Sequence, residues 1–317
     1  MPASLSLAAA RLVTGGAEHS DVVVEVIEGR VAAVRPRRPG ESCDVELPPD
    51  AVLAPGLVDL QINGAYGVDF STASPQDWAT VLGRLPETGV TSVVPTFITA
   101  PVDELVHGLK HLADARQVAA GARILGGHLE GPFLSELRRG AHNAEHLCDP
   151  TAELVDALIA AAPEGTLAIV TLAPERAGAL DAIRRLAEAG VVVSIGHSDA
   201  TAEQMAAAAD AGARMVTHLF NAQRPLHHRE PGVAGHALVD ERLALGLIVD
   251  LHHVAADVVR LVWRAAPDRV VLVTDAVAAA GMPAGRYQLG GEPVLVEPGR
   301  PPVRADGSIA GSVLSLD

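Results

Sequence analysis

The sequence predicts an α/β protein: a (β/α)8 TIM-like barrel with a small flanking β-sandwich domain formed from both chain ends. Eight short β-rich runs alternate with Ala- and Leu-rich helical patterns, which is the element count of such a barrel. Several of these runs end at a polar residue, as expected where a barrel carries its functional groups. Both chain ends have β-type and glycine-rich character. We therefore predict a β domain of residues 1–51 plus 284–317 and a barrel of residues 52–283.

Composition narrows the possible functions. The 317 residues carry 24 Lys and Arg against 39 Asp and Glu, a net charge of −15, and few aromatic side chains, so we expect no nucleic-acid partner. No run of about 18 apolar residues occurs, so we expect no membrane span. Cys43 and Cys148 are the only cysteines, and the start lacks a signal-peptide pattern. These features predict a cytoplasmic protein.

In chain order, the first 50 residues read as short β segments, with a hairpin over residues 22–34 that turns at Glu28-Gly29-Arg30. The eight β runs follow at 52–62, 91–98, 123–130, 167–175, 191–197, 215–220, 243–250 and 270–276. Helical patterns between them include 75–88, 102–120, 151–162, 177–189, 200–211 and 255–265. A doubly wound open sheet is the alternative. The spread of polar residues over many strand ends disfavours it, as does the lack of a Gly-rich dinucleotide loop.

Four strand ends carry candidate catalytic residues: Glu130, His197, His218 and Asp275. A single strand-end histidine is more often a structural hydrogen-bonding residue than a ligand. Two imidazoles and one carboxylate together, however, form a typical hydrolytic zinc set that leaves a coordination position for water. Asp275 would then be the proton acceptor, although it could instead cap the segment that follows.

The first barrel strand has polar residues at alternate positions, Asp59, Gln61 and Asn63, which would face one side of the strand. Metal-dependent hydrolases with such a barrel often carry two histidines here. Gln61 and Asn63 are neutral amides and poor ligands for a divalent cation. We therefore expect one tightly held metal ion.

A set of motifs occurs together along the whole chain, and their joint occurrence is highly specific. They are Asp59-Leu60-Gln61-Ile62-Asn63-Gly64, His128-Leu129-Glu130-Gly131-Pro132, Gly140-Ala141-His142-Asn143, Gly196-His197-Ser198, Thr217-His218-Leu219-Phe220-Asn221-Ala222, Arg229-Glu230-Pro231-Gly232 and Val273-Thr274-Asp275-Ala276. With these motifs the chain resembles the N-acetylglucosamine-6-phosphate deacetylases, a branch of the amidohydrolase superfamily.

The resemblance implies a role for each matching residue. Glu130, His197 and His218 would hold one divalent ion, zinc or alternatively ferrous iron, and Asp275 would be the catalytic acid and base. Arg229 would bind the substrate phosphate and, as in family members, can reach a neighbouring subunit's site. The family has glycine where this chain has Leu251, and a single histidine two places later. The remaining implied substrate contacts are Ala141, Asn221, Ala222, His253 (chosen over His252) and the loop Ile309, Ala310, Gly311 and Ser312.

The implied reaction is hydrolysis of the acetamide of N-acetyl-D-glucosamine 6-phosphate to D-glucosamine 6-phosphate and acetate, in amino-sugar catabolism and cell-wall recycling. The partner would be this small phosphorylated amino sugar, and we expect a homodimer or homotetramer. One alternative is another amidase or deacylase of the superfamily, which the Gln61 and Asn63 pattern and the Arg229 motif disfavour. A catalytically silent barrel that acts as a binding protein is the other, and the intact set of strand-end residues argues against it.

Family chains usually continue for some tens of residues past the loop at residues 309–312, whereas this sequence stops at Asp317. We expect the C-terminal part of the β domain and the eighth barrel helix to be truncated, which would expose apolar surface on the eighth strand.

Overall fold

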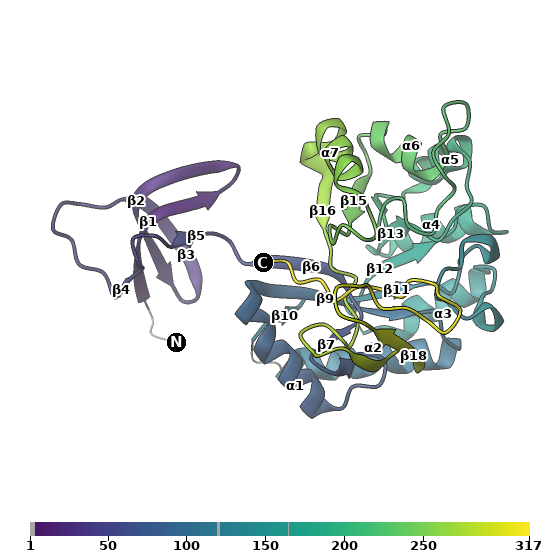
Figure 1. Cartoon of the computed structure of the whole chain (residues 1–317), viewed down its shortest axis with the longest axis horizontal. Helices are drawn as coiled ribbons and strands as arrows, with labels where there is room; N and C mark the ends of the chain where they lie inside the picture. The colour runs from purple at the N-terminus through teal and green to yellow at the C-terminus, as the bar shows by residue number, and fades with distance from the viewer. Residues whose placement is uncertain (1–3, 119–120, 164) are drawn as a thin grey trace. The chain divides into compact units, whose positions relative to one another are not determined.

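The computed structural model describes residues 4–118, 121–163 and 165–317. The chain divides into two compact units, Met1–Gly56 and Leu57–Asp317 (Figure 1). Each unit has its own sheet and its own apolar core.

The first unit is one mixed five-stranded sheet. Its strands are β1 (Ser4–Thr14), β2 (Ala17–Ile27), β3 (Arg30–Pro36), β4 (Val45–Glu46) and β5 (Val52–Leu53). The order is β3-β2-β1-β4, with β5 also paired to β1, and only β4 and β5 run parallel to β1. Glu28 and Gly29 adopt the positive φ angles that a tight β2–β3 turn requires, so the predicted hairpin is confirmed.

The second unit is built on eight parallel strands in the order expected of a barrel. The strands are β6 (Leu57–Ile62), β9 (Val90–Ile98), β11 (Gly127–Glu130), β12 (Leu167–Leu172), β13 (Val192–Ile195), β14 (Met215–Val216), β15 (Ala244–Leu247) and β16 (Val270–Leu272). Beside β9 lies the short β10 (Arg123–Ile124), which begins the third predicted run. The chain after β16 returns to β6 through a parallel bridge between Ile62 and Ala276. The predicted barrel is confirmed.

Helices lie on the outside of these strands (Figure 1). They are α1 (Pro75–Arg84), α2 (Val102–Val118), α3 (Ala152–Ala161), α4 (Ala179–Glu188), α5 (Ala202–Ala211), α6 (Gly232–Val239) and α7 (Ala256–Ala265), with 3-10 turns at Leu85–Thr88, Glu136–Arg138, Ala144–His146 and Pro267–Arg269. In α4 the buried side chains recur at helical spacing, at Ala179, Ala182, Ile183 and Leu186. The sequence predicted a helix over residues 102–120. The structure has α2 over Val102–Val118, and the last two predicted positions lie outside the described residues. None of the described helices combines the length and the apolar character needed to cross a membrane.

Two small hairpins complete the second unit. They are β7 (Gly64–Ala65) with β8 (Val68–Asp69), and β17 (Gly285–Leu289) with β18 (Glu292–Val296). Leu289, Val294 and Val296 pack with Val277 and Ala310 in a separate small core. This packing explains why residues 284–317 group with the barrel in the structure, whereas the sequence interpretation placed them in one domain with residues 1–51.

Candidate metal and acid–base site

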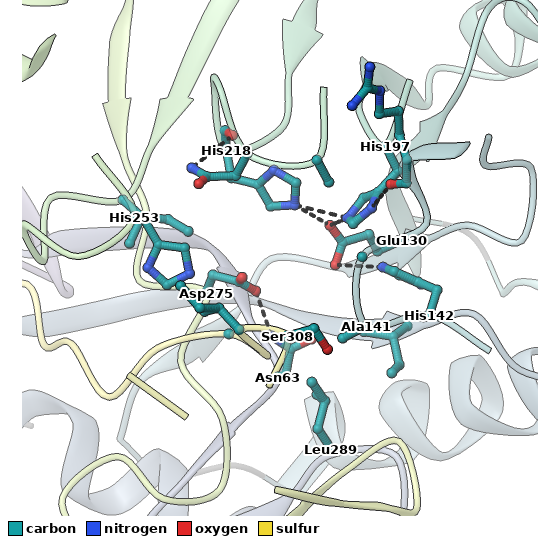
Figure 2. Close-up of a pocket in the computed structure, with 18 of the residues that line it drawn as sticks. Asn63, Glu130, Ala141, His142, His197, His218, His253, Asp275, Leu289 and Ser308 are labelled. Carbon is teal, nitrogen blue, oxygen red and sulfur yellow. Dashed lines mark hydrogen bonds and ion pairs between the residues drawn. The ribbon is translucent and has the colours of Figure 1, made fainter. Parts of the chain in front are cut away.

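A cavity of about 320 Å³ lies at the carboxyl ends of the barrel strands (Figure 2). Segments from most of the second unit reach it, because the carboxyl ends of all eight parallel strands meet at one mouth. The lining residues include Asn63, Ile98, Glu130, Leu137, Arg138, Ala141, His142, His197, His218, Asn221, Ala222, His253, Asp275, Leu289, Ser308, Ile309 and Gly311.

Glu130, His197 and His218 converge at the inner wall of the cavity. Glu130 Oε1 lies 2.9 Å from His218 Nε2 and 3.2 Å from His197 Nε2, and the two Nε2 atoms are 3.1 Å apart. All three side chains are buried, and among the described residues they form the one group whose ligand atoms lie close enough to hold a metal ion. Two nitrogens and a carboxylate oxygen suit zinc, and they also suit ferrous iron.

The surroundings of His197 leave the correct nitrogen free for a metal. Its Nδ1 donates to the Arg138 carbonyl oxygen at 2.9 Å. With a proton on Nδ1, the neutral form of the ring would present a lone pair at Nε2, toward Glu130 and His218, as a metal-binding histidine requires. Burial alone would raise the pKa of Glu130, but the two imidazoles that face its carboxylate lower it well below its ordinary value.

Asp275 stands apart from this group but is connected to it. Its Oδ1 accepts hydrogen bonds from Asn63 Nδ2 at 2.7 Å and from Gln61 Nε2 at 3.2 Å. Gln61 Nε2 also donates to Glu130 Oε1 at 3.1 Å, so one amide group bridges the two carboxylates. Burial raises the pKa of Asp275 to about 6, and the Glu130 carboxylate adds to the rise. A buried carboxylate with such a pKa can exchange a proton near neutral pH.

Three of the functional candidates have left-handed backbone conformations. The φ angles are +46° at His197, +26° at His218 and +50° at Asp275. Such φ values are costly for residues with a side chain and persist where the surrounding structure enforces them. Each lies two or three positions after the end of its strand, and its side chain lines the cavity.

A buried carboxylate that the sequence analysis left without a role holds the Asp275 segment in place. Asp59, on β6, accepts from Thr274 Oγ1 at 2.6 Å and from the Thr274 backbone N–H at 3.2 Å. From the other side, Ser312 Oγ donates to the Thr274 carbonyl oxygen at 2.6 Å, and the Ser312 N–H donates to the Asp275 carbonyl oxygen at 2.8 Å. Burial raises the pKa of Asp59 to about 7, against the hydrogen bonds from Thr274.

Most of the predicted substrate contacts lie around this cavity, and three do not. Ala141, Asn221, Ala222, His253, Ile309 and Gly311 line it. Ala310 and Ser312 are fully buried, Ala310 in the small core and Ser312 against Thr274, because alternate residues of this loop face opposite sides. Arg229 is exposed and lies at a separate hollow, where its Nη1 is 2.7 Å from His228 Nε2.

The cavity also contains residues to which the sequence analysis gave no role, above all His142. Thr99 Oγ1 is 2.9 Å from His142 Nδ1, and His142 Nε2 is 4.0 Å from Glu130 Oε2. Burial lowers the pKa of this imidazole well below its ordinary value, so the ring is neutral. Its motif, Gly140-Ala141-His142-Asn143, was the available signal. Leu289 and Ser308 come from the C-terminal segment and had no signal of their own.

Comparison with known proteins agrees with this geometry. A model of the amidohydrolase family matches residues 52–306. The chain belongs to the amidohydrolase family. An Escherichia coli O157:H7 relative named N-acetylgalactosamine-6-phosphate deacetylase is 41% identical over 98% of this chain and 81% of its own. The N-acetylglucosamine-6-phosphate deacetylase of Bacillus subtilis (strain 168) is 37% identical over 100% of this chain and 81% of its own.

Solved deacetylase structures match the fold of nearly all of this chain. A mutant N-acetyl-D-glucosamine-6-phosphate deacetylase from Mycobacterium smegmatis, in complex with N-acetyl-D-glucosamine 6-phosphate, superposes with a TM-score of 0.92. It is 40% identical, and the match covers 99% of this chain and 81% of that one. The Thermotoga maritima N-acetylglucosamine-6-phosphate deacetylase gives a TM-score of 0.87 at 30% identity, covering 98% and 81% of the two chains.

Proposed function

We propose that this amidohydrolase removes the acetyl group of N-acetyl-D-glucosamine 6-phosphate by hydrolysis, giving D-glucosamine 6-phosphate and acetate. One observation supports the proposal: a buried cluster of three side chains that could hold a metal ion and a separate buried carboxylate, Asp275, share one cavity and are bridged by the Gln61 amide. The names of the relatives supply the substrate class.

Glu130, His197 and His218 would hold one divalent ion, zinc in the first instance with ferrous iron as the alternative. Their three facing donor atoms fit such an ion, as does the His197 tautomer that leaves Nε2 with a lone pair. When bound, the ion would polarise the amide carbonyl and lower the pKa of a coordinated water.

Asp275 acts as general base and then as general acid. It removes a proton from the attacking water and later delivers it to the amide nitrogen, because an amide departs poorly as an anion. Asn63 and Gln61 each donate to Asp275 Oδ1, so they fix the carboxylate's direction. His253 lines the same cavity and would bind the acyl oxygen as negative charge develops on it.

Among the described residues, the cavity lining offers no unpaired arginine or lysine for the substrate phosphate. Arg138 lines the cavity, but Asp199 lies 2.7 Å away and neutralises it. Arg229 is exposed and away from the cavity of its own chain. We propose that Arg229 binds the phosphate in the site of a neighbouring copy, within a homodimer or homotetramer, as a two-pronged donor.

The test is to incubate the purified, metal-loaded chain with N-acetyl-D-glucosamine 6-phosphate and to measure acetate and free amine. We expect both in equal amounts, with a lower rate on unphosphorylated N-acetylglucosamine. The 4-epimer, N-acetyl-D-galactosamine 6-phosphate, belongs in the same assay because one relative is named for it. Faster turnover of N-acyl amino acids or cyclic amides would favour another amidase. Binding of the sugar phosphate without any acetate would indicate a silent binding protein.

A further inference from the structure

His253 has a buried partner outside the cavity. The imidazole lines the cavity close to Asp275 (Figure 2). On the opposite edge of the ring, Nδ1 lies 2.7 Å from Asp250 Oδ2. The two side chains keep only 7% and 10% of their surface exposed, so little solvent competes for this contact.

The Asp250 carboxylate accepts three hydrogen bonds from one short segment. Its Oδ1 accepts from the backbone N–H groups of His252 at 2.9 Å and of His253 at 2.8 Å, while Oδ2 faces the ring. Burial opposes ionisation, but these hydrogen bonds together lower the pKa of Asp250 to about 2. An ionised carboxylate has no proton to give, so the hydrogen in the contact with Nδ1 must belong to His253.

We infer that Asp250 is a positioning residue, which keeps a proton on Nδ1 of His253 and thereby presents Nε2 to the substrate. Under this arrangement Nε2 carries a proton only when the ring is an imidazolium. His253 would then meet the developing negative charge on the acyl oxygen as a charged donor, and no proton needs to be transferred. This inference rests on the proposed function, since it assigns how His253 serves that reaction.

The substitution Asp250→Asn separates proton placement from loop structure. The asparagine oxygen can still accept both backbone N–H groups, because an amide oxygen has two lone pairs. The amide NH₂ then faces Nδ1 and must donate to it, which moves the proton of the neutral ring to Nε2. The loop and the ring orientation stay, while His253 becomes a neutral donor.

Nitrogen-15 NMR of histidine-labelled, metal-loaded protein tests the tautomer directly, with the His253 signals assigned by their absence in His253→Ala. For the neutral ring at alkaline pH, we expect the proton on Nδ1 in the wild type and on Nε2 in Asp250→Asn. A wild-type neutral ring with its proton on Nε2 would overturn the inference. This measurement needs no variant at position 250, so it decides even if Asp250→Asn folds poorly.

Kinetics supply the second readout. A charge-assisted hydrogen bond is roughly twice as strong as a neutral one, so Asp250→Asn should lose about tenfold in kcat with little change in KM. The matched control is Asp257→Asn, which removes a carboxylate with 93% exposed side chain on α7 and should keep full activity. A kcat for Asp250→Asn within twofold of wild type would overturn the inference, as would an equal loss in the control. A wild type that releases no acetate would refute the proposed function instead, and the NMR result would still decide whether Asp250 sets the tautomer.

Discussion

The substitution Asp275→Asn is the sharpest test of the acid–base assignment. The asparagine oxygen can take the place of Oδ1 and accept from Asn63 and Gln61, whose donor atoms lie 2.7 and 3.2 Å away. The shape of the site and its hydrogen bonds are therefore kept, and only the proton acceptor is lost. Because Asp275 is not one of the three clustered ligand residues, the variant should retain its metal.

The size of the fall in kcat of Asp275→Asn distinguishes a general base from a residue that only makes a structural hydrogen bond. General acid–base catalysis contributes about 10²–10⁴-fold, which corresponds to roughly 3–5 kcal/mol of barrier. A perturbed neutral hydrogen bond contributes about 0.5–1.5 kcal/mol, or at most roughly tenfold. We expect kcat for acetate release to fall by at least about 10²-fold, with KM within a few-fold of wild type. A loss below tenfold would remove Asp275 from proton transfer, and loss of the metal on dialysis would make it a ligand.

The pH profile checks the same assignment. A base works when ionised, so the rate should fall as pH drops through the pKa of Asp275. Burial raises that pKa from 3.8 to about 6, and a bound cation would pull it back down. We expect the acid limb of kcat to have its midpoint between these two values. The residual activity of Asp275→Asn should lack that limb, and an identical limb in the variant would assign it to another group.

Three further outcomes are expected. Arg229→Ala should weaken binding of the 6-phosphorylated sugar by about 10–100-fold while leaving the unphosphorylated sugar unaffected; Arg224→Ala, in the same hollow, is the control. Mixing Arg229→Ala chains with Asp275→Asn chains should restore activity if the arginine acts across an interface, and equal losses on both sugars would make it structural. Leu251 is 60% exposed with φ +63°, so Leu251→Gly should relieve strain and raise the melting temperature by about 1–3 °C, whereas Leu251→Ala should not. Metal analysis after dialysis should find one equivalent per chain; two would contradict the interpretation of the β6 amides as poor ligands.

The sequence was sufficient for the residues whose position follows from topology. Glu130, His197, His218 and Asp275 each lie at or near the end of a predicted β run, and a barrel brings all such ends to one mouth, so their proximity could be predicted. Asp59 could not be given its role, because its partner Thr274 is 215 positions away and the contact depends on how the first and eighth strands meet.

Two other features of the structure could not be predicted from the sequence. In the loop of residues 309–312, Ile309 and Gly311 line the cavity while Ala310 and Ser312 are buried, and no sequence pattern reveals which alternate residues face inward. The C-terminal residues have β character, but the choice of the barrel as their packing partner depends on side-chain fit around Val277.

The left-handed conformations at His197, His218 and Asp275 set stability against activity at the site. Glycine adopts such φ values without steric cost, so a thermostability selection blind to function would favour glycine at these positions. The same substitutions would delete two candidate ligands and the candidate base. Laboratory evolution toward heat resistance must therefore be coupled to an activity screen. Without the screen, it would select stabilising glycine substitutions that remove the functional side chains.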